Sequence, residues 1–277
     1  MMKPRPPVTP TFATGEDAVK STQALYTNHI RNASAASLYW PLQLILNELG
    51  FDWQARRDLP AKILRIFKIE EDEQCAAEMI WNLLGSRSHI VSEKISGRAD
   101  HIVSQIGEHV RGPSVLDFGC GDGRVGMAIA KMGNTVAMYD VDDYRCAEAK
   151  ALSFSRSWCD MAPRINESYD TALAITVFHH CDDPENEIAE LRLDARRLIV
   201  IESVVDEQMP YTTQAVVDWI YNRGMHPGAQ IPVPGQFRTA QAWRETFAQH
   251  HFRVIHEQDL GIDLSVVPEH HHLFVCE

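Results

Sequence analysis

The sequence predicts an α/β fold: a doubly wound sheet of seven strands, the last of them antiparallel, preceded by a cap of helices. Three observations lead to this prediction. About the first hundred residues carry only helical periodicity, a short apolar strand then runs directly into a glycine-rich loop at 119–123, and strand-like and helical segments alternate from there onward. Alternation of this kind is typical of βαβ units, in which helices cover both faces of a parallel sheet.

The N-terminal part is predicted to form a tail and then a helical cap. Residues 1–13 are rich in proline, and we expect a flexible tail there. Residues 14–97 form the cap, because apolar residues recur at helical spacing and no strand-like alternation interrupts them. The positions that carry the pattern include Leu25, Ile30, Leu38, Leu42, Ile45, Leu46, Ile80, Leu83 and Leu84. A second predicted helix of the cap, residues 61–69, begins after Pro60. We expect the cap to be a lid or the contact surface of a homodimer.

The pattern changes after Gly112 and Pro113, and we assign residues 98–277 to the sheet domain. The predicted strands are 114–116, 135–139, 169–177 and 197–201, and the helices between them include 124–132 and 184–193. Two further strands, 252–258 and 271–276, are joined by a connection too short for a helical crossover, so we expect them to be antiparallel.

The segment most indicative of function is Val115-Leu116-Asp117-Phe118-Gly119-Cys120-Gly121-Asp122-Gly123. Glycine at every second position allows positive φ and lets a ligand approach the backbone closely. In a doubly wound sheet this loop lies at the carboxyl ends of the strands, where ligands bind. Asp140, at the end of the next strand, is placed to hold a ribose diol.

The chemistry of the loop favours a cationic nucleoside over a dinucleotide. Its spacing is G-x-G-x-G, whereas a nicotinamide-binding loop carries G-x-G-x-x-G and faces a pyrophosphate. The carboxylates of Asp117 and Asp122 would repel a pyrophosphate but attract an ammonium or sulfonium group. A nicotinamide-dependent oxidoreductase is therefore the less favoured reading, as is a tight turn that binds no ligand.

Taken in order, these motifs resemble the class I S-adenosylmethionine-dependent methyltransferases over about residues 98–277. The matching segments are 115–123, 136–142, 158–161, 169–180, 183–192 and 197–202. The resemblance implies a Rossmann-like sheet and S-adenosylmethionine as the cofactor.

The resemblance also implies the roles of individual residues. Gly119 and Gly121 would line the methionine part of the cofactor, and Asp117 would lie near its amino group. Asp140 would hold the ribose hydroxyls, and Asp142 is a less favoured candidate because it falls past the expected strand end. The remaining implied contacts are Cys120 in the glycine loop, Val141, Asp160 and Met161 around the adenine, and Thr176 and Val177 over the sulfonium.

Two histidines are the catalytic candidates. His180 and His179 follow the fourth strand, at the edge where cofactor and acceptor would meet. A histidine titrates near neutral pH and can act as the general base for a hydroxyl acceptor. For each histidine the alternative is a structural hydrogen bond to the next loop through Asp182 or Asp183, and we prefer that alternative for His179.

Candidates for acceptor binding come from two places. Tyr221 and Arg223 lie in an insertion at about 206–245 that we expect to bind the acceptor, although Arg223 would equally pair with Asp218. His270 belongs to a histidine run before the last strand and is expected at the mouth of the site. A metal bound by His180, His270 and Asp263 lacks the tight ligand spacing of known sites, so we predict no metal.

Composition limits the partners. The chain has 38 acidic and 26 basic residues, a formal charge of −12, which disfavours nucleic acid. Its six cysteines form no C-x-x-C pair, which argues against a zinc cluster or a disulfide framework. No secretory signal or membrane-length apolar run is evident, so we expect a cytoplasmic protein without membrane contact.

The sequence thus predicts methyl transfer from S-adenosylmethionine to a small-molecule metabolite. Oxygen is the favoured acceptor atom because histidines are available as bases, and carbon comes next. The alternative from another class is a methyltransferase-like scaffold that binds the nucleoside without catalysis.

Overall fold

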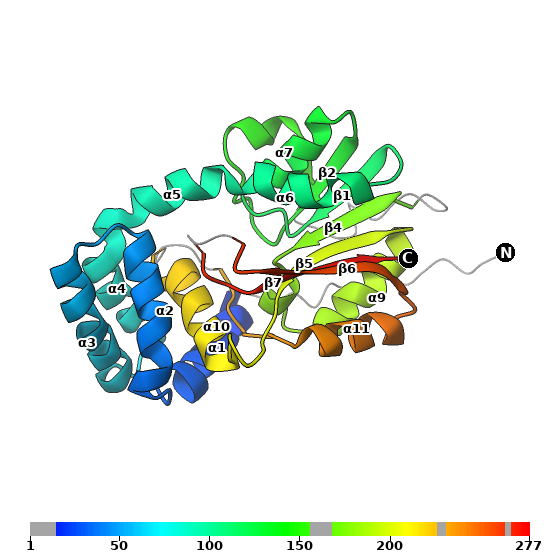
Figure 1. Cartoon of the computed structure of the whole chain (residues 1–277). Helices are drawn as coiled ribbons and strands as arrows, with labels where there is room; N and C mark the ends of the chain where they lie inside the picture. Colours follow the sequence, from blue (N-terminus) through cyan, green and yellow to red (C-terminus); the bar gives the residue numbers. More distant parts are fainter. Residues whose placement is uncertain (1–14, 156–167, 226–230, 264–266) are drawn as a thin grey trace.

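A seven-stranded sheet with the order β3-β2-β1-β4-β5-β7-β6 organises the second half of the chain (Figure 1). The computed structural model describes residues 15–155, 168–225, 231–263 and 267–277. The strands are β1 (Ser114–Phe118), β2 (Thr135–Tyr139), β3 (Ser153–Ser155), β4 (Thr171–Ile175), β5 (Leu198–Ser203), β6 (Val254–Gly261) and β7 (His271–Cys276). Strands β1 to β5 are parallel, and β7 is antiparallel to both of its neighbours. The predicted doubly wound sheet with an antiparallel last strand is confirmed.

Helices cover both faces of this sheet (Figure 1). They are α6 (Arg98–Ile106), α7 (Arg124–Lys131), α9 (Pro184–Asp194) and α11 (Ala240–Gln249). The central strands alternate between the two layers: Leu173 and Ile199 pack with α6 and α7, whereas Ala172 and Leu198 pack with α9 and α11. Because both faces are covered, β4 and β5 are buried along their whole lengths, which explains their continuous apolar sequences.

The N-terminal helices form a separate layer beside the sheet (Figure 1). They are α1 (Gly15–Leu25), α2 (Ala35–Glu48), α3 (Trp53–Ile69), α4 (Glu73–Leu84) and α5 (Ser88–Ser96). Ser34, Asp52 and Asp72 cap α2, α3 and α4, each accepting a hydrogen bond from a backbone N–H three residues later. The expected helix boundary at Pro60 is wrong, since α3 continues through that proline and begins at Trp53.

The insertion predicted at about 206–245 contributes to both layers. Its first helix, α10 (Tyr211–Trp219), and the helical turn Ile220–Gly224 share one apolar core with the N-terminal helices. Trp219 stacks on Tyr26 with ring centroids 5.4 Å apart. The end of the insertion is α11, which belongs to the sheet instead. The cap is therefore built from two segments of the chain. Among the described residues, no helix is both long and apolar enough to cross a membrane.

Candidate active site

The glycine turn after β1 has a conformation that requires glycine. Gly119 has φ of 68° and Gly121 has φ of 51°, both in the left-handed region. The amide of Gly119 donates to the Tyr139 carbonyl at 2.8 Å, which holds the turn against the end of β2. A Cβ at Gly119 would lie 2.1 Å from Val177 Cγ2, whereas a Cβ at Gly121 would meet nothing within 4 Å. The turn therefore packs tightly against the loop after β4 on one side and is open on the other.

The open side faces a cavity of 560 Å³ at the carboxyl ends of the parallel strands. It lies between the glycine turn, α6, the loop after β4 and the end of α10. Eleven of the residues proposed from the sequence line it, namely Asp117, Gly119, Cys120, Gly121, Asp140, Val141, Thr176, Val177, His179, His180 and Tyr221. Asp160 and Met161 lie outside the described residues. The cavity therefore unites the expected cofactor and catalytic positions.

Two carboxylates, Asp117 and Asp140, line the glycine end of the cavity. Asp117 is 2% exposed, and burial raises its pKa to about 7, an effect that the N–H of Gly126 offsets only in part. Burial also raises the pKa of Asp140 to about 6, although the amides of Gly121 and Val141 each donate to this carboxylate at 2.8 Å. Both groups would ionise more readily beside a cation or when further hydrogen-bond donors reach them.

His179 is held between two carboxylates. Its Nδ1 lies 2.7 Å from Glu202 Oε2 and its Nε2 lies 3.8 Å from Asp218 Oδ1, and all three side chains are buried. Burial opposes the charged imidazole, but Glu202 and Asp218 outweigh it and raise the pKa of His179 well above its ordinary value. The other oxygen of Glu202 accepts from the amides of Val177 and Phe178. The hydrogen bond expected from Asp182 or Asp183 is therefore wrong for His179, whose partner is Glu202.

His180 has a different environment. Its Nδ1 donates to the Pro232 carbonyl at 2.6 Å, and its Nε2 lies 3.6 Å from Asp218 Oδ1. Burial, together with the neighbouring His179, lowers the pKa of His180. Because the carbonyl can only accept, the neutral ring carries its proton on Nδ1 and presents the lone pair of Nε2 toward Asp218. The hydrogen-bond partner of His180 is thus the Pro232 carbonyl, and not Asp182 or Asp183 as expected.

Two of the proposed acceptor-binding residues lie outside the cavity. Arg223 points into the cap, where its Nε lies 3.0 Å from Glu73 Oε1, so neither an acceptor carboxylate nor Asp218 is its partner. His270 bonds to Asp206 and Asp259 at 2.7 and 2.6 Å, also away from the cavity. Both side chains are paired with carboxylates that do not line the cavity, so the structure corrects both assignments.

Four residues that line the cavity or contact its lining residues were not assigned to the site from the sequence. Glu202 ends the apolar run of β5, Asp218 interrupts the apolar stretch of α10, and both are buried. A lone carboxylate within an apolar segment is a usable signal, because a buried charge needs partners. Arg98, which donates to Thr176 Oγ1 at 3.0 Å, and Glu269, which accepts from Ser203 Oγ at 2.6 Å, carried no comparable signal.

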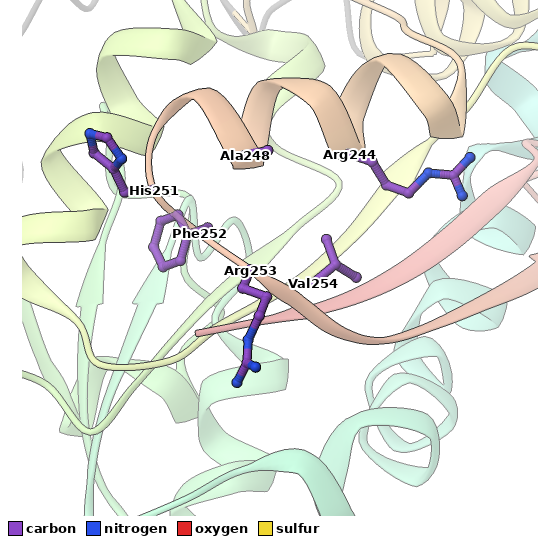
Figure 2. A pocket seen from close by; sticks show the side chains of 6 residues that line it. All are labelled: Arg244, Ala248, His251, Phe252, Arg253 and Val254. Atoms are coloured by element: carbon purple, nitrogen blue, oxygen red, sulfur yellow. The ribbon is translucent and has the colours of Figure 1, made fainter.

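A second, shallow pocket lies far from this chemistry (Figure 2). Its lining residues are Arg244, Ala248, His251, Phe252, Arg253 and Val254. They come from the end of α11 and the start of β6, which runs in the same direction as β5 because β7 is antiparallel to both. The pocket therefore lies at the amino edge of the sheet, opposite the glycine turn.

Comparison with known proteins places the chain in a family. The family model described as a methyltransferase domain matches residues 87–257, which is more than half of the 277-residue chain. A search of curated proteins found no match. Among solved structures, magnesium protoporphyrin IX methyltransferase from Synechocystis PCC 6803 is 16% identical, with 67% of this chain and 84% of that chain covered and a TM-score of 0.47.

Two further solved structures are similar at the same level. One is 1,6-didemethyltoxoflavin-N1-methyltransferase from Burkholderia thailandensis, with 16% identity, coverage of 65% of this chain and 76% of that chain, and a TM-score of 0.47. The other is an S-adenosylmethionine-dependent methyltransferase from Mesorhizobium loti, with 13% identity, coverage of 62% and 95%, and a TM-score of 0.46. The match of the family model over the glycine turn and the strands that line the cavity shows that the chain belongs to the methyltransferase domain family.

Proposed function

We propose that this methyltransferase uses S-adenosylmethionine to methylate a small molecule, with oxygen as the favoured acceptor atom and carbon next. The observation that carries the proposal is the glycine end of the cavity, where an open turn lies beside the carboxylates of the buried Asp117 and the half-buried Asp140. The cavity volume of 560 Å³ falls within the range of small-ligand sites, about 300–1,000 Å³.

The residues of this end suit the proposed cofactor. Gly121 leaves open space for the methionine part, because a Cβ there would meet nothing within 4 Å. The carboxylate of Asp140, which the amides of the surrounding loops hold in place, lines the cavity and would accept from the ribose hydroxyls. Asp117 supplies a negative charge for an amino group, and Val141 supplies an apolar wall for the adenine. When bound, S-adenosylmethionine would supply a methyl group on a sulfonium, which is already activated for transfer.

The other end of the cavity would receive the acceptor. Tyr221 and Asn222, from the cap, and His180 line it together. Since the cap closes this end, it would position the acceptor in line with the donor and exclude water. His180, kept neutral by burial and with Nε2 as the acceptor nitrogen, would take the proton from a hydroxyl group, and Asp218 would stabilise the resulting imidazolium.

Two measurements test this function. Calorimetry with S-adenosylmethionine and, separately, with NADH is expected to give binding only for the sulfonium compound. Tight NADH binding with no response to S-adenosylmethionine would reject the proposal. A panel of hydroxylated metabolites is then screened for production of S-adenosylhomocysteine, and turnover of one class of small acceptor is expected. Cofactor binding without turnover of any acceptor would instead support a nucleoside-binding scaffold.

A further inference from the structure

Three potential metal ligands converge in the cavity. His179, His180 and Asp218 each offer one ligand atom, and these atoms all lie within 4.8 Å of one another. The two Nε2 atoms face the same oxygen, Asp218 Oδ1, at 3.8 Å from His179 and 3.6 Å from His180. All three residues line the cavity, so a bound ion would be reached from it.

The remaining ring nitrogen of each histidine is already fixed. His179 Nδ1 lies 2.7 Å from Glu202 Oε2, and His180 Nδ1 lies 2.6 Å from the Pro232 carbonyl oxygen. Histidines that bind metals characteristically donate their other N–H to a carboxylate or a backbone carbonyl, which fixes the tautomer and the direction of the ring. Here the two rings show one example of each partner, and both leave Nε2 directed at Asp218.

Direct hydrogen bonding does not account for these distances. A hydrogen bond from nitrogen to oxygen spans about 2.7–3.2 Å, and both Nε2 contacts are longer than that. Two ligand atoms that each lie about 2.1 Å from one ion are separated by about 3–3.5 Å, which is closer to the observed spacing. The second carboxylate oxygen, Asp218 Oδ2, is buried and has no hydrogen-bond partner among the residues that the structure describes. A buried carboxylate with an unsatisfied oxygen is stabilised by a cation.

The carboxylates around the three residues also attract a cation, and an ion bound at His179 Nε2 would displace the proton that Glu202 and Asp218 favour there. Three buried carboxylates, Glu202, Asp218 and Glu269, belong to this part of the molecule. Ser203 and His271 hold Glu269, at 2.6 and 3.6 Å. Asn222 donates to Asp218 Oδ1 at 2.6 Å and so fixes the orientation of that carboxylate without neutralising it.

We propose that His179, His180 and Asp218 bind one divalent transition-metal ion through the two Nε2 atoms and a carboxylate oxygen. Two imidazoles favour ions such as Zn²⁺, Co²⁺ or Fe²⁺ over Mg²⁺, which prefers oxygen ligands throughout. Three protein ligands leave positions open toward the cavity. In those positions the ion would bind an acceptor that offers a hydroxyl group, alone or beside a carbonyl group, and would lower the pKa of that hydroxyl.

The role of the ion in methylation rests on the proposed function, whereas metal binding itself does not. With the ion bound, the lone pair of His180 Nε2 is occupied, so His180 cannot take the hydroxyl proton. The ion would instead lower the pKa of that hydroxyl so that its proton is lost to solvent, and the resulting alkoxide would receive the methyl group as S-adenosylhomocysteine leaves. Metal binding and cofactor binding therefore have to be measured separately on the same protein.

The test uses the full chain without an affinity tag, first dialysed against a chelator. Titration with Co²⁺, followed by its visible absorption and by calorimetry, is expected to show one equivalent bound. Asp218→Asn and His180→Ala should each weaken Co²⁺ binding by more than about 100-fold, and Glu202→Gln by about 10- to 100-fold. His256→Ala, which changes an exposed histidine of β6, is the matched control and should bind Co²⁺ as the wild type does.

S-adenosylmethionine calorimetry on the same samples separates the two proposals. Variants that bind the cofactor normally but not Co²⁺ are folded and have lost only the metal site. Absence of a stoichiometric Co²⁺ spectrum in a wild type that binds the cofactor would overturn the metal site and leave the proposed function standing. Stoichiometric Co²⁺ binding without cofactor binding would support the metal site and overturn the proposed function.

A wild-type crystal grown with Co²⁺ answers the question without any variant. Its anomalous signal should lie within bonding distance of His179, His180 and Asp218. A signal only at the exposed histidines, or none at all, would overturn the proposal.

Discussion

Glu73 and Arg223, 150 residues apart in the sequence, form a bidentate ion pair inside the cap. Arg223 Nε and Nη2 donate to Glu73 Oε1 and Oε2, both at 3.0 Å, and the two side chains are almost fully buried. Trp219 Nε1 donates to the same carboxylate at 2.9 Å. The pair therefore joins α4 to the turn that follows α10, and it holds together the two chain segments that make up the cap.

Removing one partner of this pair is expected to destabilise the protein. Arg223→Met leaves the Glu73 carboxylate buried without its counter-charge, which should lower the free energy of unfolding by about 3–5 kcal/mol. The double change Glu73→Leu with Arg223→Met removes both charges and should recover most of the loss. Urea unfolding of the wild type, the single variant and the double variant measures both effects. If Arg223→Met is as stable as the wild type but raises the KM for the acceptor, the original assignment of Arg223 to acceptor binding would be restored.

The position of Arg223 could not be predicted from the sequence, unlike the sheet and the glycine turn. The sheet and the glycine turn could be predicted because their signals are local: short apolar segments that alternate with helical ones, glycine spacing and an acidic residue at the end of the next strand. Arg223 could not be placed, because its partner Glu73 is 150 residues away and nothing near Arg223 indicates it. His270 could not be placed either, because it contacts both the distant Asp206 and Asp259 on the neighbouring strand β6. Burial of a charged side chain is decided by tertiary packing, which no single segment encodes.

The sequence also could not predict that His179, His180 and Asp218 lie close together. The two histidines were selected as catalytic candidates from their position after the fourth strand. Asp218 comes from a helix that was expected only to lie near the acceptor, and its approach to the histidines depends on how the cap packs on the sheet. A local pattern identified the chemistry of two residues but could not identify the third.

Gly119→Ala is expected to disrupt the cofactor site. An alanine would be forced to a φ near 68°, which costs roughly 1–2 kcal/mol, and its Cβ would lie 2.1 Å from Val177 Cγ2. We expect at least about tenfold weaker S-adenosylmethionine binding, since 1.4 kcal/mol corresponds to a factor of ten. Adding Val177→Ala removes the 2.1 Å contact but leaves the Cβ of residue 177 at 2.8 Å, so it should restore only part of the affinity, as measured by calorimetry.

Gly133→Ala is the matched control for this substitution. Gly133 also has a positive φ, 99°, but a Cβ there would meet nothing within 4 Å and the residue lies outside the cavity. It should therefore reduce stability slightly while leaving cofactor affinity unchanged. Equal losses of affinity in Gly119→Ala and Gly133→Ala would mean that the turn contributes only to folding.

Asp140→Asn should weaken cofactor binding about 10- to 100-fold, because hydrogen bonds to a charged carboxylate are worth about 1.5–3 kcal/mol. The asparagine oxygen can still accept from the amide of Gly121, but its NH₂ group cannot accept from the amide of Val141. Asp142→Asn, two residues further on, serves as the control and should bind the cofactor normally. If Asp142→Asn weakened cofactor binding and Asp140→Asn did not, Asp142 and not Asp140 would hold the ribose.

Cofactor affinity should increase with pH between about pH 5 and 7.5. Burial raises the pKa of Asp140 to about 6 and that of Asp117 to about 7, so both carboxyls are largely protonated at pH 5. A cationic ligand binds better to the ionised carboxylates and lowers both pKa values, so binding releases protons. Raising the pH removes in advance the protons that the ligand would otherwise have to displace. Cofactor affinity therefore rises with pH until both groups are ionised.

Calorimetry in buffers with different ionisation enthalpies measures the number of protons released when the cofactor binds. Release should be largest near pH 6 and should fall toward zero above about pH 8, because Asp117, whose pKa is about 7, is still half protonated at pH 7. Asp117→Asn should remove the upper part of the pH dependence, leaving only the rise that is centred on Asp140. An affinity that is constant or decreases from pH 5 to 7.5 would show that neither carboxyl meets the cation, because a neutral or anionic ligand gains nothing from their ionisation.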